Sequence, residues 1–145
     1  MNIMLRHPDP DACAALAHWR HTWKMAIEAM QVLSAVRIGL GLDAPYKLSH
    51  AHHPITLWTG RSREHYAFTL RRARSLLDEY SRRYNKVSAP LEAAYAALID
   101  IPDALPSEPI TSYCVCRRNQ PTVYVETIEE AVVLYRQYLG IEVIT

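Results

Sequence analysis

The stretch that decides the fold runs from His21 to Gly41 and reads HTWKMAIEAMQVLSAVRIGLG. It contains no proline, and no glycine before Gly39, so it predicts a helix of about five turns from about His21 to Ile38. At roughly 100° per residue, four polar side chains fall within one arc of about 80°. This polar seam consists of His21, Lys24, Glu28 and Gln31. Most other positions are apolar, which predicts a central helix whose polar seam faces a pocket rather than bulk water.

Capping residues and helix breakers predict more helices on both sides of this stretch. Asp9 and Pro10 open a helix that continues to about Arg20. Further helices are expected from Pro54 to Trp58, from a cap at Ser62 to about Tyr84, from Ser88 and Pro90 to near Ile99, and from the capping box of Thr127 and Glu130 to Gly140. The prolines between 102 and 121 indicate an irregular connection, and a short strand is expected around Val123 to Val125. The predicted fold class is all-α: a single compact helical domain of about five to six helices, with at most a short peripheral strand or hairpin.

Length and charge indicate how this domain is organised. The 145 residues are 50% hydrophobic and carry a net charge of +1, which suits one domain with a sizeable core. We expect residues 1–86 to hold the helical core and the site, and residues 87–145 to form an acidic C-terminal helical extension. Between positions 61 and 86 there are eight basic and three acidic residues, whereas residues 87–145 include three basic and eight acidic ones. A basic helix of this kind can attract a polyanion, although solvated surface charges give the same pattern.

Compartment and redox state can also be predicted. No run approaches the roughly 20 consecutive apolar residues of a membrane span, and residues 1–10 lack the basic flank and apolar run of a secretion signal. We therefore expect a cytoplasmic protein without a membrane partner. The three cysteines are an odd number, and Cys114 and Cys116 are one residue apart. This spacing predicts reduced thiols rather than a disulfide framework.

Candidate ligand-binding side chains also occur on the long helix after Ser62. One edge of its apolar face carries side chains that can reach round into a cleft, namely His65, Arg72, Glu79 and Arg83. The outer face carries four arginines that could meet phosphates, Arg63, Arg71, Arg74 and Arg82, and plain solvation is the alternative for these.

The loop YKLSHAHHP, residues 46–54, is the most unusual local sequence. We expect Lys47, His50 and His53 to offer hydrogen bonds and positive charge to an anionic ligand, with His52 pointing outward; a structural role is the alternative for each histidine. Three histidines in four residues also suggest zinc. However, the sequence has no HExxH motif, and Cys114 and Cys116 are too close for the usual zinc clamp, so no metal is expected. A glycine-rich phosphate loop and a nucleophile elbow are missing as well, and no cofactor is expected.

Taken together, these residues resemble a group of small phage proteins and, more remotely, the pyrimidine-dimer DNA glycosylase (endonuclease V) family, over about residues 1–86. The resemblance rests on Leu16 to His21, Lys24, Met25, Glu28, Gln31, Leu33, Tyr46, Lys47, His50, His53, Pro54, Trp58, Ser62, Asp78 to Tyr80 and Arg83. In that family a histidine precedes the catalytic glutamate by seven positions, as His21 precedes Glu28. The resemblance implies an all-helical fold and a glycosylase with lyase activity. In such an enzyme an amine attacks C1′ of a damaged nucleotide, a Schiff base forms, and the glutamate assists proton transfer.

The first functional prediction is therefore a DNA- or nucleotide-acting enzyme of the DNA glycosylase/lyase or base-modifying type. Its catalytic residues would be Glu28, His21 and Lys24. Its ligand- or phosphate-binding residues would be Gln31, Lys47, His50, His53, His65, Arg72, Glu79 and Arg83. The alternative is a non-catalytic phage protein that binds a nucleotide or a host factor in the same pocket, because Asn2 should prevent removal of Met1 and because Ile27 and Gln31 replace two arginines of the family. A third possibility is a structural protein in which Glu28 pairs with Lys24 or His21 inside the core.

Overall fold

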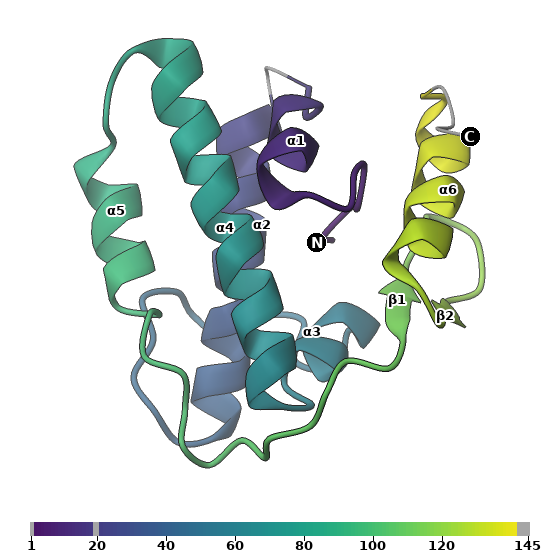
Figure 1. Ribbon diagram of the computed structural model, residues 1–145. Helices are drawn as coiled ribbons and strands as arrows, with labels where there is room; N and C mark the ends of the chain where they lie inside the picture. The colour runs from purple at the N-terminus through teal and green to yellow at the C-terminus, as the bar shows by residue number, and fades with distance from the viewer. Residues whose placement is uncertain (1, 19–20, 142–145) are drawn as a thin grey trace.

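A computed structural model describes residues 2–18 and 21–141. Its central element is α2, Thr22–Gly39, which lies behind α4, Arg63–Tyr84, in Figure 1. These two helices share the most extensive contact between elements of the chain. Around them lie α1 (Pro10–Ala15), α3 (Pro54–Thr59), α5 (Ala89–Ala96), β1 (Tyr113–Val115), β2 (Val123–Val125) and α6 (Ile128–Leu139). The described residues thus form a mostly helical domain with six helices and one short hairpin, which confirms the predicted fold class.

The helix ends follow from side chains that satisfy free backbone groups. The Asp9 carboxylate accepts a hydrogen bond from the Ala12 amide at 2.8 Å and begins α1. The Ser62 hydroxyl caps α4 by accepting from the His65 amide, and the Thr127 hydroxyl caps α6 by accepting from the Glu130 amide. Gly140 ends α6 in the left-handed region, with φ 70°. The caps predicted at Asp9, Ser62 and Thr127 are therefore confirmed.

Two helices are shorter than predicted, and one strand was not located from the sequence. Among the described residues α1 ends at Ala15, and Arg20, its expected end, lies outside them. Helix α5 ends at Ala96 rather than near Ile99. Strand β2 occurs at the predicted residues and pairs in antiparallel fashion with β1, where Cys114 is opposite Tyr124. The prediction allowed for a hairpin but did not locate β1, whose residues are held extended by their pairing with β2.

The N-terminal segment, residues 2–8, lies between two groups of buried side chains. One core joins α1, α2, α4 and α5, with Met30, Leu33 and Tyr66 almost completely buried. The other joins the N-terminal segment, α3, the hairpin and α6 through side chains that include Ile3 and Tyr135. In Figure 1 the start of the chain accordingly lies between α1 and α6. The N-terminal segment is thus packed between the two cores.

Three arginines from two helices hold this part of the chain by its backbone. The guanidinium of Arg72, on α4, donates to the carbonyl oxygens of His7, at 3.0 Å, and of Pro8. Arg83, in the last turn of α4, donates to the carbonyls of Ala15 and Ala17, both at 2.7 Å. Arg136, on α6, donates from Nε to the carbonyl of Arg6 at 2.7 Å. Because residues 2–8 belong to no helix or strand, these side chains supply donors that secondary structure would otherwise provide.

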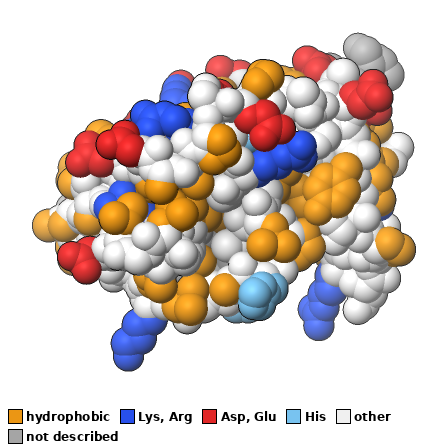
Figure 2. Space-filling model, turned by 90° about the horizontal axis from the view of Figure 1, so that it is seen from below, with side chains coloured by type: hydrophobic (Ala, Val, Ile, Leu, Met, Phe, Trp, Pro, Cys, Tyr) orange, Lys and Arg blue, Asp and Glu red, His pale blue; other side chains and the backbone are white. Residues whose placement is uncertain are grey.

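The surface at the far end of α2 is partly apolar. Leu40, Leu48 and Leu57 are exposed there, and they line a shallow hollow of about 310 Å³ between α2 and α3. Figure 2 views the molecule from below and shows hydrophobic side chains distributed across this face. Within the described part of the chain, no helix has the length and apolar character needed to cross a lipid bilayer.

The backbone contacts of Arg72 predict a large loss of stability when its guanidinium is removed. In Arg72→Met two partly buried carbonyls lose charged donors, and each such hydrogen bond is worth about 1.5–3 kcal/mol. Because water can partly replace these donors, we expect a loss of about 2–4 kcal/mol in all, which lowers the melting temperature by roughly 4–16 °C at this chain length. The matched control is Arg71→Met, because Arg71 is half-exposed and pairs with Asp11 on the surface; it should cost about 1 kcal/mol or less. Equal melting temperatures for the two variants would contradict the backbone-anchoring role of Arg72.

Candidate functional site

Two hollows meet along the first half of α2 and share Asn2, Met4 and Lys24 in their walls. The smaller, of about 250 Å³, is completed by Arg6, His21, Met25, Glu28 and Leu139. The larger, of about 590 Å³, is completed by His53, Pro54, Cys116, Arg117, Arg118, Thr122 and Tyr138. Together they form one depression, here termed the cationic groove, between α2, the N-terminal segment and the unit of hairpin and α6. Its combined size falls in the range of sites for small organic ligands.

The charges in the cationic groove are strongly unequal. Four of its described lining residues have basic side chains, namely Arg6, Lys24, Arg117 and Arg118, whereas Glu28 is the one carboxylate among them. Lys24 and Glu28 are four residues apart on α2 and therefore lie on the same face, one turn apart. Positive charge gathered in a concave surface concentrates anions there.

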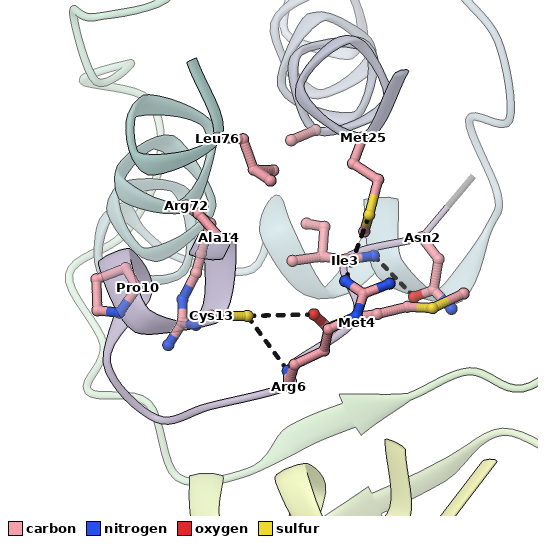
Figure 3. Close-up of a pocket in the computed structure, with 11 residues that line it drawn as sticks. Asn2, Ile3, Met4, Arg6, Pro10, Cys13, Ala14, Met25, Arg72 and Leu76 are labelled. Carbon is pink, nitrogen blue, oxygen red and sulfur yellow. Dashed lines mark hydrogen bonds between the residues drawn. The ribbon is translucent and has the colours of Figure 1, made fainter. Parts of the chain in front are cut away.

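Arg6 is the least expected member of this set because its side chain is almost completely buried, at 8% exposure. Its Nη1 atom donates to the sulfur of Met25 at 3.4 Å, as Figure 3 shows, and among the described residues its guanidinium has no carboxylate within ion-pair distance. Burial lowers the pKa of Arg6, and the nearby Cys13 partly opposes this shift. Buried charges are ordinarily paired, because removing a charge from water is costly. The Arg6 guanidinium is thus a cationic position at the groove wall with which no carboxylate of the described residues forms an ion pair.

Arg117 contributes a second guanidinium group to the groove wall. Its Nε atom is buried and has no hydrogen-bond partner among the described residues. The neighbouring backbone is fixed, since the Cys116 carbonyl accepts from Asn2 Nδ2 at 2.7 Å and the Arg118 amide donates to the Tyr138 hydroxyl at 3.2 Å. The hairpin therefore presents two adjacent guanidinium-bearing residues to the cationic groove from a defined backbone position.

His53 enters the groove from the start of α3. Its Nδ1 atom accepts a hydrogen bond from the Ile55 amide at 3.1 Å, so this nitrogen carries no proton and the ring has Nε2–H available as a donor. Burial is the main cause that lowers the pKa of His53. The ring is therefore neutral at neutral pH and can donate one hydrogen bond to an uncharged part of a ligand.

The structure divides the predicted site residues into two groups. His21, Lys24, Glu28 and His53 line the cationic groove. The others do not line it: Gln31 is half-buried on α2, Lys47 and His50 are exposed on the loop before α3, and His65, Arg72, Glu79 and Arg83 are buried or half-buried on α4. The ring of His50 lies 6.3 Å from that of His53, edge to face.

The α4 residues already have partners within the chain. Glu79 pairs with Arg82 and Arg83, and Arg83 in turn holds the backbone that leads into α2. The His65 ring bonds through Nδ1 to the Ser62 hydroxyl and lies 4.6 Å from the Trp58 ring. These contacts support a scaffolding role on α4, which was the alternative for the structural histidines in the sequence.

Several groove residues were missed in the sequence, chiefly Arg6, Arg117, Arg118 and Cys116. The adjacent pair Arg117–Arg118 was a visible signal within an otherwise acidic region. Arg6 gave none, because it precedes the first predicted helix and belongs to no periodic pattern. No three histidine, cysteine or carboxylate side chains of the described residues come close enough together to hold a metal ion.

Comparisons with known proteins add no relative to this geometry: no protein-family model, no curated protein and no solved structure matches the chain. The cationic groove is therefore interpreted from its own residues alone.

The buried histidines predict a loss of stability in mild acid. Burial lowers the pKa of His65 from its ordinary value of 6.5, so the unfolded chain binds a proton more readily than the folded chain. Stability is therefore complete above about pH 6.5 and is lost as the pH falls through the lower pKa of the folded state. The melting temperature of the wild type should fall between pH 7 and pH 5, and that of His65→Phe should fall less. His52→Asn, which changes an exposed histidine, should retain the wild-type dependence; identical curves for all three proteins would refute this prediction.

Proposed function

We propose that the protein is a DNA- or nucleotide-acting enzyme of the glycosylase/lyase or base-modifying type, and that the cationic groove receives the phosphate-bearing part of its ligand. The observation that carries this proposal is the buried Arg6 guanidinium, which has no carboxylate partner in the described chain and lies beside Lys24. A phosphate group would supply the missing negative charge and can accept two parallel hydrogen bonds from a guanidinium. Nucleic acids and nucleotides are ligands in which such a phosphate is joined to a base.

The roles within the groove follow from the chemistry of each side chain. Arg6, Arg117 and Arg118 would bind phosphate oxygens. The Lys24 amine would attack C1′ of the nucleotide as the bond from C1′ to the base breaks, and Glu28, one turn further along α2, would move the proton between the amine, the sugar and the departing base. The His53 Nε2–H group would hydrogen-bond to the base. This arrangement accords with the resemblance to the endonuclease V family in the position of the glutamate, and it places the attacking amine on a side chain.

A second candidate function uses the same groove without any chemical step. The protein would bind a nucleotide or a host factor, and Glu28 would help to select the ligand rather than transfer protons. The observation that favours this reading is the exposure of Lys24, because an attacking amine is usually activated by partial removal from water. Recovery of an unaltered nucleotide from the purified protein would support it, and turnover of that nucleotide would exclude it.

Borohydride trapping of Glu28→Gln tests the enzymatic proposal directly. Duplexes with thymine dimers, abasic sites or modified pyrimidines are incubated with protein and borohydride, which converts a Schiff base into a stable adduct. The wild type should be trapped on at least one of them, Lys24→Gln should not be, and Glu28→Gln should lose about 10²-fold or more in rate. Glu129→Gln, an exposed change on α6, should behave as the wild type. No adduct on any substrate would remove the glycosylase reading.

The same variant decides whether Glu28 is a functional group or half of a buried ion pair. A glutamine keeps the size and hydrogen-bonding capacity of the glutamate, so a functional Glu28 can be replaced with little change in melting temperature. A buried ion pair costs about 3–5 kcal/mol when one partner is removed, which lowers the melting temperature by roughly 6–20 °C. A drop of that size would contradict the functional role.

Ligand binding and stability should change in opposite directions in Arg6→Met. The methionine fills the same space without an unpaired charge, so the melting temperature should stay constant or rise. The affinity for a fluorescent oligonucleotide, measured by anisotropy at low salt, should fall about tenfold or more, since a charged hydrogen bond to phosphate is worth about 1.5–3 kcal/mol. Arg72→Met is the matched control, because Arg72 is equally buried but its donors are satisfied. Loss of stability without loss of binding in Arg6→Met would overturn the role given to Arg6.

A further inference from the structure

Cys114, on β1, and Cys116, the residue directly after β1, form a dithiol at the wall of the cationic groove. They are two positions apart in the sequence. Their sulfur atoms are 3.6 Å apart, both side chains are buried, and both thiols are free. Cys116 lines the larger hollow together with Arg117 and Arg118, whereas Cys114 is not among the residues of that hollow. Cys116 is thus reachable from the groove, whereas Cys114 lines a separate small hollow with Ile3 and Trp58.

We propose that this pair is a peroxide-reactive site in which Cys116 is the attacking thiolate and Cys114 is the resolving thiol, and that it closes reversibly into a disulfide. The inference concerns residues to which the proposed function assigns no role. It would stand even if the groove bound no nucleotide.

The two sulfurs differ in the way that such a division of roles requires. The hydrogen bond between the thiols lowers the pKa of Cys116 to about 7 and raises the pKa of Cys114. The hydroxyl of Thr122 lies 3.9 Å from the Cys116 sulfur and also favours its thiolate. At neutral pH Cys116 is therefore a substantial nucleophile, while Cys114 keeps its proton.

The reaction balances with one hydrogen peroxide molecule as the oxidant. The Cys116 thiolate attacks one peroxide oxygen, the O–O bond breaks, and Cys116 sulfenic acid and hydroxide form. The Cys114 sulfur then attacks the sulfenic sulfur, the S–S bond forms, the S–O bond breaks, and the thiol proton leaves with the hydroxyl group as water. The proton originally released by Cys116 neutralises the hydroxide. Two thiols and one peroxide thus give one disulfide and two water molecules.

A disulfide between these two residues should be reversible. A thiol reduces a disulfide by attacking one of its sulfur atoms, and Cys116 lines the groove from which such a thiol would approach. Dithiothreitol should therefore restore the dithiol without denaturing the protein.

Cys13 provides the internal control. Its sulfur accepts from the Arg6 amide at 3.2 Å and donates to the Met4 carbonyl at 3.5 Å. It adjoins a cavity of about 20 Å³, which has room for about one water molecule, and the other lining residues described include no second cysteine. Figure 3 shows it enclosed between the N-terminal segment and α4. Because no second cysteine among the described residues lines its cavity, we expect Cys13 to react as a single thiol.

The experiment treats the full chain with a small excess of hydrogen peroxide at pH 7 and follows intact mass and peptide maps. The wild type should lose a pair of hydrogen atoms through a Cys114–Cys116 bond, and dithiothreitol should reverse the change. In Cys114→Ser, dimedone should trap the sulfenic acid on Cys116. Cys116→Ser should react at least about tenfold more slowly, in keeping with the low thiolate fraction of a thiol of high pKa. Cys13→Ser should react as the wild type.

Two results would overturn the proposal: a wild type that forms no Cys114–Cys116 bond, or a Cys116→Ser variant that reacts at the wild-type rate. A measurement on the wild type tests the same assignment without relying on variants that could misfold. Iodoacetamide labelling of the wild type at increasing pH, read by peptide mapping, should modify Cys116 with a midpoint near pH 7 and leave Cys114 largely unmodified. Labelling of Cys114 first would equally overturn the assignment.

Discussion

The rest of the structure depends on guanidinium groups that bind backbone carbonyls of the first seventeen residues. Residues 2–8 form neither helix nor strand, and yet they pass between two buried cores. Such a path is stable only when their carbonyls find donors, and Arg72 and Arg136 supply them from α4 and α6. Arg83 does the same where the chain enters α2. These contacts turn the start of the chain into the wall against which both the helical core and the hairpin pack.

The cationic groove remains open because the N-terminal segment does not fill the space beside α2. Arg6 and Arg72 flank Cys13 (Figure 3) and are buried to almost the same extent, but they differ in their partners. Arg72 is satisfied by carbonyls, whereas the Arg6 guanidinium meets a methionine sulfur and no carboxylate of the described chain. Buried charges are ordinarily balanced by an opposite charge or by strong acceptors, so a buried guanidinium whose acceptor is a weak one points to a function. That contrast is the physical basis for expecting an anionic ligand.

The residues that line the groove are far apart in the sequence, so position along the chain did not predict which of them share the site. Its walls come from α2, from the N-terminal segment, and from a hairpin about ninety residues further on, which the sequence placed in an acidic extension away from the site. On α4, side chains of the same types serve another purpose, since Glu79 and Arg83 pair with each other and hold the backbone. In the sequence, an arginine that binds a ligand cannot be distinguished from one that holds the backbone. The sequence shows the donor but not the acceptor that it contacts.

The sequence by itself determined the helices and most of their starting points, but not the ends of α1 and α5. Local capping by Ser62 and Thr127 and the 3.6-residue period of α2 and α4 are short-range effects, and for this reason the mostly helical fold and the shared face of Lys24 and Glu28 could be predicted. Only the tertiary structure decided which polar side chains share a site. It joined His53 to the seam of α2, left Gln31, Lys47 and His50 outside the groove, and brought in Arg6, Arg117 and Cys116. The physical reason is that the charge and accessibility of a site depend on distances between segments, and those distances are set by packing rather than by any local pattern.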